Sequence, residues 1–216
     1  MRITQGHTVI IRTFLHIIQL GFLAQLVALT LMGGFGADPI EGLTKFTGIA
    51  ALNSLVFSLL ISPMSRYFKL GLLIKVRRPA GIYSFVWATL HVCVYAFLDL
   101  ALNVSLLISE IIERPFLTVG FVAWLILLAL TVTSTKGMQR RLGRKWQSLH
   151  NWVYAAMLLV PVHFYWSSKS ELIEPSIYII VALVLLTLRR RNIKNWSKSL
   201  LSPLQKLIYN ARVKPQ

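Results

Sequence analysis

RRLGRKWQSLHNWVYAAMLLVPVH, residues 140–163, joins a basic segment directly to an apolar segment that carries two histidines. On an α-helix, His150 and His163 would lie about 20 Å apart along the axis, which is most of the roughly 30 Å apolar thickness of a bilayer. A histidine inside a membrane span is costly and by default indicates function. Two histidines at opposite depths of one helix indicate a path across a membrane rather than a single pocket.

The composition of the whole chain is typical of a helical membrane protein. Of its 216 residues, 56% are hydrophobic and only 14% are charged, and the net charge is +16. Basic residues that flank apolar segments more often set membrane topology than bind nucleic acid, so we expect no nucleic-acid partner. The first apolar run lacks a small-residue cleavage site and is interpreted as a retained span. Cys93 is the single cysteine, which excludes an internal disulfide, and no motif for covalent haem attachment is present.

Apolar runs near the spanning length of about 20 residues recur along the chain. Because a membrane span must satisfy its backbone hydrogen bonds internally, we expect helices rather than strands. The predicted fold is therefore all-α, a polytopic six-span helical bundle that forms a single domain over residues 1–216. The predicted spans are residues 13–32, 46–63, 79–98, 116–134, 149–166 and 172–188.

The charged residues predict the orientation of these spans. Lysines and arginines cluster in alternate loops, whereas all seven acidic residues lie in the other loops, together with Lys45, Arg114 and Lys169. By the positive-inside rule, both termini are cytoplasmic. The tail at 192–216 is then a basic cytoplasmic segment. Its leucines at helical spacing predict an amphipathic segment on the membrane surface, with a solvated tail as the alternative.

Three histidines inside the predicted spans form a candidate haem site. Counted from the outer ends of their spans, His91 and His163 lie about 12 Å and about 9 Å deep. Two imidazoles at equal depth on neighbouring helices can bind one haem iron axially. Counted from the inner ends of the spans, the depth of His91 falls between the depths of His150 and His163. Helix tilt and a kink at Pro161 therefore also determine which histidines lie at the same depth. We favour His91 with His163. His150 lies nearer the inner face, and His16 is an extra candidate ligand whose simpler interpretation is helix packing.

Other interpretations of these residues stay open. Histidines in spans can also serve as packing or proton-relay residues, which would fit a six-span transporter without haem. Against a transporter, no predicted span is expected to contain a buried Asp or Glu, and no inverted repeat is evident. A zinc or copper site fits poorly, because no cluster of carboxylates or thiolates completes a compact shell. The basic residues Arg77, Arg78 and those in 140–145 either set topology and contact lipid headgroups, or hold an anionic cofactor such as a flavin phosphate or haem propionates.

Several motifs make the chain resemble the MsrQ family, within the ferric-reductase-like transmembrane domains. They are GADP at 36–39, FTG at 46–48, RR at 77–78, WATLH at 87–91, RPFLTVG at 114–120 and the long TSTKGMQRRLGRKWQSLHNWVY at 133–154. The resemblance covers essentially the whole chain.

The resemblance implies a b-type haem protein of the bacterial inner membrane that also binds FMN. Such a subunit is not itself the catalytic reductase. It passes electrons from the quinone pool or a cytoplasmic flavin reductase to a periplasmic, molybdopterin-containing methionine sulfoxide reductase, which repairs oxidised envelope proteins. The haem-ligand histidines of the family correspond here to His91, His150 and His163. Outer-loop acids, Asp38, Glu41, Glu110 and Glu113, are candidates for orienting the partner, or they simply keep charge on the outer side.

The chain departs from the wider superfamily at one point. Members of that group usually carry two histidines on the third span as well as two on the fifth. Thirteen and fourteen residues before His91, this chain has Arg78 and Arg77. An inner haem on His150 would therefore lack its usual second ligand. Three solutions stay open: His16 as substitute, no sixth protein ligand, or no second haem.

Overall fold

The computed structural model describes residues 5–168 and 171–198, and within these ranges the chain is helical and contains no strand. The elements are α1 (Gln5–Leu31), α2 (Pro39–Tyr67), the 3-10 helix η1 (Gly71–Val76), α3 (Arg77–Cys93), the π-helix η2 (Val94–Asp99), α4 (Val104–Glu113), α5 (Pro115–Val132), α6 (Lys136–Leu142), α7 (Arg144–His150), α8 (Val153–Ser167) and α9 (Ile173–Thr187). The predicted all-α class is confirmed for this part of the chain.

Within the described residues, four helical segments are long and apolar enough to cross a membrane: α1, α2, the continuous η1–α3–η2 segment and α5. Helices α8 and α9 have 15 residues each, which corresponds to about 22 Å of helix. Each of the six predicted spans overlaps an apolar helix, α1, α2, α3, α5, α8 or α9, whereas the number of spans and the orientation of the termini stay predictions. The predicted amphipathic tail lies largely outside the described residues, which end with a helical stretch at 190–198.

Local sequence explains where the helices begin. Asp38 caps α2, because its Oδ1 accepts the backbone N–H of Glu41 at 2.9 Å, and Pro39 occupies the first turn. Asn103 and Thr135 cap the short helices α4 and α6 in the same way. The sequence analysis missed α4, α6 and α7 because each has ten residues or fewer and therefore gives only a weak periodic signal.

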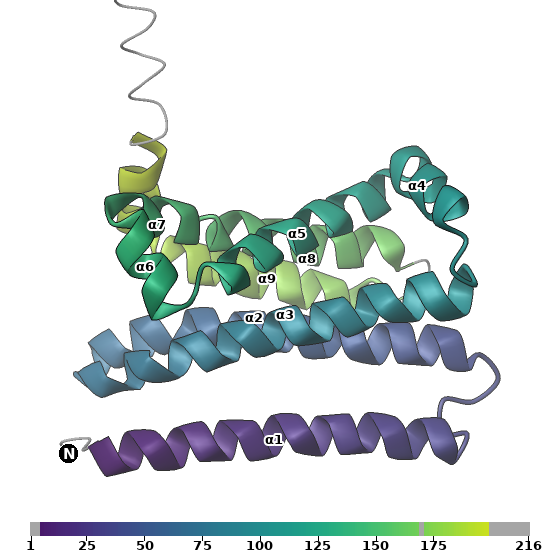
Figure 1. Ribbon diagram of the computed structural model, residues 1–216, viewed down its shortest axis with the longest axis horizontal. Helices are drawn as coiled ribbons and strands as arrows, with labels where there is room; N and C mark the ends of the chain where they lie inside the picture. Colours follow the sequence, from purple (N-terminus) through teal and green to yellow (C-terminus); the bar gives the residue numbers. More distant parts are fainter. Residues whose placement is uncertain (1–4, 169–170, 199–216) are drawn as a thin grey trace, which may run out of the picture.

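The helices pack as two pairs, α2 with α3 and α5 with α8, and α9 packs on α8 (Figure 1). Small residues let α2 and α3 approach closely, as is common between membrane helices. Ser84 donates to the Ala51 carbonyl at 3.0 Å, and Ser58 donates to the Arg77 carbonyl at 3.3 Å. The main apolar core lies between α2, α5, α8 and α9, and includes Leu52, Leu55, Leu59, Leu127, Tyr154, Ala156, Met157 and Leu185.

Helix α1 is peripheral (Figure 1) and is tied to the bundle by buried polar contacts. The indole N–H of Trp87, which is only 2% exposed, donates to Gln19 Oε1 at 2.6 Å. The same Gln19 side chain donates to Ser54 at 3.3 Å. One turn earlier on α1, His16 Nδ1 lies 2.7 Å from the Tyr83 hydroxyl. These contacts fix α1 against α2 and α3.

Replacing Trp87 with phenylalanine should weaken this attachment, because Gln19 Oε1 then stays buried without its donor. Hydrogen bonds between membrane helices contribute about 0.6 kcal/mol on average and about 1.7 kcal/mol at most. We therefore expect W87F to lower the free energy of unfolding by about 1 kcal/mol, measured by circular dichroism during SDS titration of protein in mild detergent. Trp166, which is 56% exposed, supplies the control W166F, with an expected change below about 0.5 kcal/mol. Equal effects of both substitutions would refute the role of the Trp87–Gln19 bond.

The helix connections gather at two opposite ends of the bundle (Figure 1). The sequences of the connections at the two ends differ in charge. The acidic end contains Asp38, Glu41, Asp99, Glu110, Glu113, Glu171 and Glu174. The basic end contains Arg66, Arg77, Arg144 and Arg189. The candidate functional residues fall into one group toward the acidic end and another at the basic end.

Candidate functional site

His91 lies near the C-terminal end of α3 and is held by the backbone of α2. Its Nδ1 lies 2.9 Å from the carbonyl oxygen of Thr44. Because a carbonyl only accepts, Nδ1 carries the proton and donates it. In the neutral ring, Nε2 is then the atom with a free lone pair. This is the tautomer that a metal-binding histidine needs, and hydrogen bonding of the opposite nitrogen is typical of such ligands.

His163 lies on α8 and is held by α5 in the same manner. Its Nδ1 lies 2.7 Å from the carbonyl oxygen of Phe116, so Nδ1–H donates and Nε2 keeps its lone pair. The Phe116 ring also stacks on the imidazole, with centroids 6.2 Å apart. The side chain is thereby fixed in both position and tautomer.

The structure brings these two histidines together from helices that are far apart in sequence. The ring centroids of His91 and His163 lie 6.1 Å apart, and the ring planes are nearly perpendicular at 87°. Two imidazoles bound on opposite sides of one metal have centroids about 6 Å apart, because each metal–nitrogen bond is about 2 Å and each nitrogen lies about 1 Å from its ring centre. The spacing and the protonation pattern of the pair therefore fit two axial ligands of one haem iron.

A bare metal ion is a poorer occupant of this place. Among residues 5–168 and 171–198, no group of three or more His, Cys, Asp or Glu side chains is gathered for a metal ion. Zinc sites need three or four such ligands. Two histidines alone suit a metal whose remaining ligands come from a macrocycle, as in haem.

His150 differs from these two histidines in its contacts. It ends α7, stacks on Trp146 with centroids 4.0 Å apart, and places Nε2 3.2 Å from the Thr133 hydroxyl. That hydroxyl also lies 2.6 Å from the Ala129 carbonyl, to which it donates, so Nε2 of His150 is the donor of the histidine–threonine bond. The structure thus places His150 apart from the His91–His163 pair, with Nε2 engaged by the protein.

His16 is likewise held by another side chain. Its Nδ1 bonds to the Tyr83 hydroxyl at 2.7 Å, and the two rings pack edge to face. This matches the helix-packing interpretation of His16. His16 thus contacts Tyr83 of α3, whereas His150 contacts Thr133 and Trp146.

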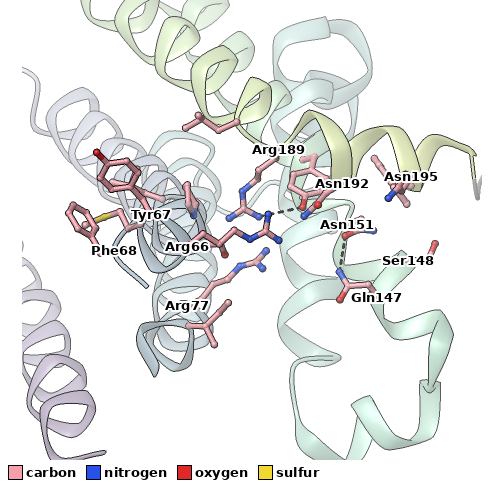
Figure 2. Close-up of a pocket in the computed structure, with 18 of the residues that line it drawn as sticks. Arg66, Tyr67, Phe68, Arg77, Gln147, Ser148, Asn151, Arg189, Asn192 and Asn195 are labelled. Carbon is pink, nitrogen blue, oxygen red and sulfur yellow. Dashed lines mark hydrogen bonds between the residues drawn. The ribbon is translucent and has the colours of Figure 1, made fainter. Parts of the chain in front are cut away.

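An open cavity of about 1050 Å³ lies at the basic end, where α2, α3, α7, α8 and the 190–198 helix meet. Figure 2 shows the side chains of Arg66, Arg77 and Arg189 turned toward this space, across from the asparagines Asn151 and Asn192. Arg144 also lines the cavity. Among the described lining residues there is no Asp or Glu. Four guanidinium groups without a carboxylate favour an anionic ligand.

The wall of this cavity contains three buried polar atoms. Within the described part of the chain, Ser62 Oγ, Arg189 Nε and Trp196 Nε1 are buried and lack a hydrogen-bond partner. All three residues line the cavity. Buried polar groups in proteins are normally satisfied. Because these three donors have almost no exposed surface, a ligand would reach them only after the cavity wall rearranges.

Arg189 is the most deeply placed cation of the cavity. Its side chain is 5% exposed, and it donates to the Leu59 carbonyl at 2.6 Å and to the Tyr154 hydroxyl at 3.4 Å. Its guanidinium also lies 5.7 Å from the centre of the Tyr154 ring. These contacts use the two terminal nitrogens and hold Nε beside the cavity, so Arg189 is oriented before any ligand binds.

The structure separates the two arginines that the sequence grouped together. Arg77 is half-buried and lines the cavity, whereas its neighbour Arg78 is exposed and is not among the lining residues. Within residues 140–145, only Arg144 lines the cavity. The predicted cofactor contacts at Arg77 and Arg78 are thus placed in different surroundings.

Ion pairs at the acidic end lie next to the two carbonyls that hold the histidines. Lys45, which follows Thr44, pairs with Glu171 at 2.7 Å and lowers the pKa of that carboxyl through the hydrogen bond and its charge. Arg114, shortly before Phe116, pairs with Glu110. Of the acids predicted to orient a partner, Glu110 is thus paired and Asp38 caps α2. Glu41 and Glu113 are exposed.

Sequence reasoning missed the supports of the histidines and part of the cavity. The carbonyls of Thr44 and Phe116 carry no side-chain signal. A glycine lies under each ring, Gly48 under His91 and Gly120 under His163. These glycines are the last residues of the FTG and RPFLTVG motifs, and their place in these motifs was the sequence feature that pointed to them. The position of Arg189 directly after an apolar run indicated only the end of a membrane span.

Comparison with known proteins gives a consistent family. Residues 47–161 match the family model described as "Ferric reductase like transmembrane component". A Salmonella arizonae protein, "Protein-methionine-sulfoxide reductase heme-binding subunit MsrQ", is 48% identical over 201 residues, which cover 92% of this chain and 100% of that relative. Proteins of the same name from Salmonella paratyphi B and Salmonella newport are 51% identical over 165 residues, 76% of this chain and 83% of each relative. No solved structure matches.

Proposed function

The chain belongs to the MsrQ family of heme-binding membrane subunits, and from this membership we propose that it carries electrons across a bacterial inner membrane to a periplasmic methionine sulfoxide reductase. The observation that carries the proposal is the His91–His163 pair, with each Nδ1 bound to a carbonyl and the rings 6.1 Å apart. In this proposal the chain is the electron-transfer subunit, and its molybdopterin-containing partner reduces the sulfoxide.

His91 and His163 would hold a b-type haem through their Nε2 atoms. A bound haem supplies reversible one-electron transfer at its iron. The protein contributes two neutral, oriented imidazoles and an apolar surround. Donation from each Nδ1–H to a carbonyl raises the basicity of the ligand, which favours the ferric state and tunes the potential. His150 stays a candidate ligand of a second haem nearer the basic end.

The cavity at the basic end would hold FMN, which family membership suggests. A bound flavin supplies both one- and two-electron chemistry, as a link between a two-electron donor and a one-electron acceptor requires. Arg77 and Arg189 would bind its phosphate, and Arg66 and Arg144 would supply further positive charge to the same cavity. The donor is then a cytoplasmic flavin reductase or the quinone pool.

The charge distribution supports the direction of transfer. By the positive-inside rule the basic end faces the cytoplasm, as do both termini, and the acidic end faces the periplasm. The histidine pair lies nearer the acidic end, next to the start of α2 and α5. Exposed Glu41 and Glu113 at that end would orient the reductase partner electrostatically.

Visible spectroscopy tests this function directly. Protein purified in detergent after haem-replete expression should show a Soret band and, after dithionite reduction, an α-band in the reduced-minus-oxidised spectrum. Flavin fluorescence in the supernatant of the denatured protein should report FMN. Colourless protein would refute the haem site and with it the electron-transfer role. Haem without flavin would leave the histidine pair in place and refute only the flavin cavity.

A further inference from the structure

One helix supports His91 with a carbonyl and, one turn later, a glycine. A carbonyl has two lone pairs. In α2, the Thr44 carbonyl accepts the N–H of Gly48 by the helical pattern, and its other lone pair takes the His91 Nδ1–H at 2.9 Å. The imidazole of His91 lies against α2 in the space that a side chain at position 48 would occupy. A Cβ on Gly48 would lie 3.1 Å from Nδ1 and 3.2 Å from Cε1, tighter than an ordinary contact.

The support of His163 is built in the same way and is tighter. The Phe116 carbonyl takes Nδ1–H at 2.7 Å, and Gly120 lies one helical turn later on α5. A Cβ on Gly120 would lie 2.7 Å from both Nδ1 and Cε1 of His163. These are ring atoms held by a hydrogen bond, not the movable end of a flexible side chain. A side chain at position 120 would therefore force the imidazole off its carbonyl.

The two supports also share their spacing in the sequence. Each histidine follows its carbonyl by 47 residues. The second carbonyl, glycine and histidine (Phe116, Gly120, His163) each follow the first (Thr44, Gly48, His91) by 72 residues. A shift of 72 residues also relates Arg78 to His150. The second helix pair therefore has a histidine near the basic end at the position where the first pair has an arginine. The α2–α3 and α5–α8 pairs thus build the same support twice, once on each side of the site.

We propose that Gly48 and Gly120 are positioning residues for the two metal-binding imidazoles. Because neither glycine has a side chain, each ring lies flat enough on its helix to donate from Nδ1 and to present Nε2 to the shared site. The inference rests on the proposed haem function. Neither Gly137 nor Gly143, the glycines nearest His150 in the sequence, lies under its ring, because a Cβ at either position would meet open space.

Substitution of single glycines by alanine in the full-length protein tests the proposal. Disturbing the hydrogen-bond partners of metal ligands typically weakens binding by 10- to 100-fold, so we expect G120A to lower the haem-to-protein ratio about tenfold and G48A about twofold. Haem that stays bound should show a shifted α-band and midpoint potential. The matched control is G81A on α3, where a Cβ would meet Ser58 Oγ at an ordinary 3.5 Å. It receives the same gain in helix propensity and should behave as wild type.

A double-mutant cycle on protein prepared without haem separates the support from folding in general. G120A should destabilise the wild-type background toward SDS, whereas in the H163A background, where the ring is gone, it should not. Such coupling is expected only for residues in contact. Because the cycle needs no haem, it tests the contact between Gly120 and His163 independently of the proposed function. A wild-type protein that binds no haem would refute the proposed function but not this contact. Wild-type haem content and spectra in G120A, or equal destabilisation in both backgrounds, would overturn the positioning role.

Discussion

Replacing His163 with alanine should remove most of the haem from the protein. Substitution of residues that merely hydrogen-bond to a metal ligand already costs 10- to 100-fold in affinity, so loss of the ligand itself should lower the haem-to-protein ratio by about tenfold or more. H91A should have the same effect, because the two ring centroids lie only 6.1 Å apart and the proposed site needs both imidazoles. The measurement is the reduced-minus-oxidised spectrum per mole of detergent-purified protein.

Two other histidines provide the controls for this loss. H16A removes a ring bound to Tyr83 and should keep the full haem signal. H150A removes a ring whose Nε2 is bound to Thr133 and should keep the haem of the His91–His163 pair. If H150A loses a fraction of the haem while the rest keeps its spectrum, His150 holds a second haem. Full retention of haem by either H91A or H163A would show that the assigned pair is wrong.

The helices and the histidine pair were accessible from sequence for physical reasons. Long apolar runs specify membrane helices almost by themselves, because lipid leaves the backbone no other partner. Depth along a helix follows from residue counting, which is why His91 and His163 could be matched from their outer ends. Counting could not show that Nε2 of His150 is tied to Thr133, because that bond joins α7 to the residue just after α5 and depends on tertiary packing.

The supports of the pair show a second limit of sequence reasoning. A backbone carbonyl is present at every residue, so nothing in the letters marks Thr44 or Phe116. Gly48 and Gly120 are visible as glycines, but their use emerges only when a ring lies on each of them. Arg189 gave the same difficulty, since an arginine after an apolar run predicts a membrane boundary. Its burial and its bond to the Leu59 carbonyl are set by packing of the 188–189 turn against α2.

Replacing Arg77 with glutamine should release flavin, whereas the same replacement of Arg78 should not. The two arginines are adjacent at the start of α3, yet only Arg77 lines the cavity at the basic end. A hydrogen bond to a charged group contributes about 1.5–3 kcal/mol, which corresponds to about 10- to 100-fold in affinity. We therefore expect R77Q to weaken FMN binding by at least about tenfold. The measurement is fluorescence of FMN titrated into dialysed protein.

The exposed neighbour makes this comparison decisive. R78Q removes the same charge from the same end of the molecule but leaves the lining of the cavity unchanged. It therefore reproduces any general electrostatic effect of R77Q, and should change FMN affinity by less than about twofold. Arg189 is a less suitable target, because its bond to the Leu59 carbonyl makes its loss a folding defect as well. Haem content should stay at the wild-type value in both variants, since the histidine pair lies toward the acidic end. Equal weakening by R77Q and R78Q would mean that the basic end attracts anions only through its net charge, and that the cavity is not the flavin site.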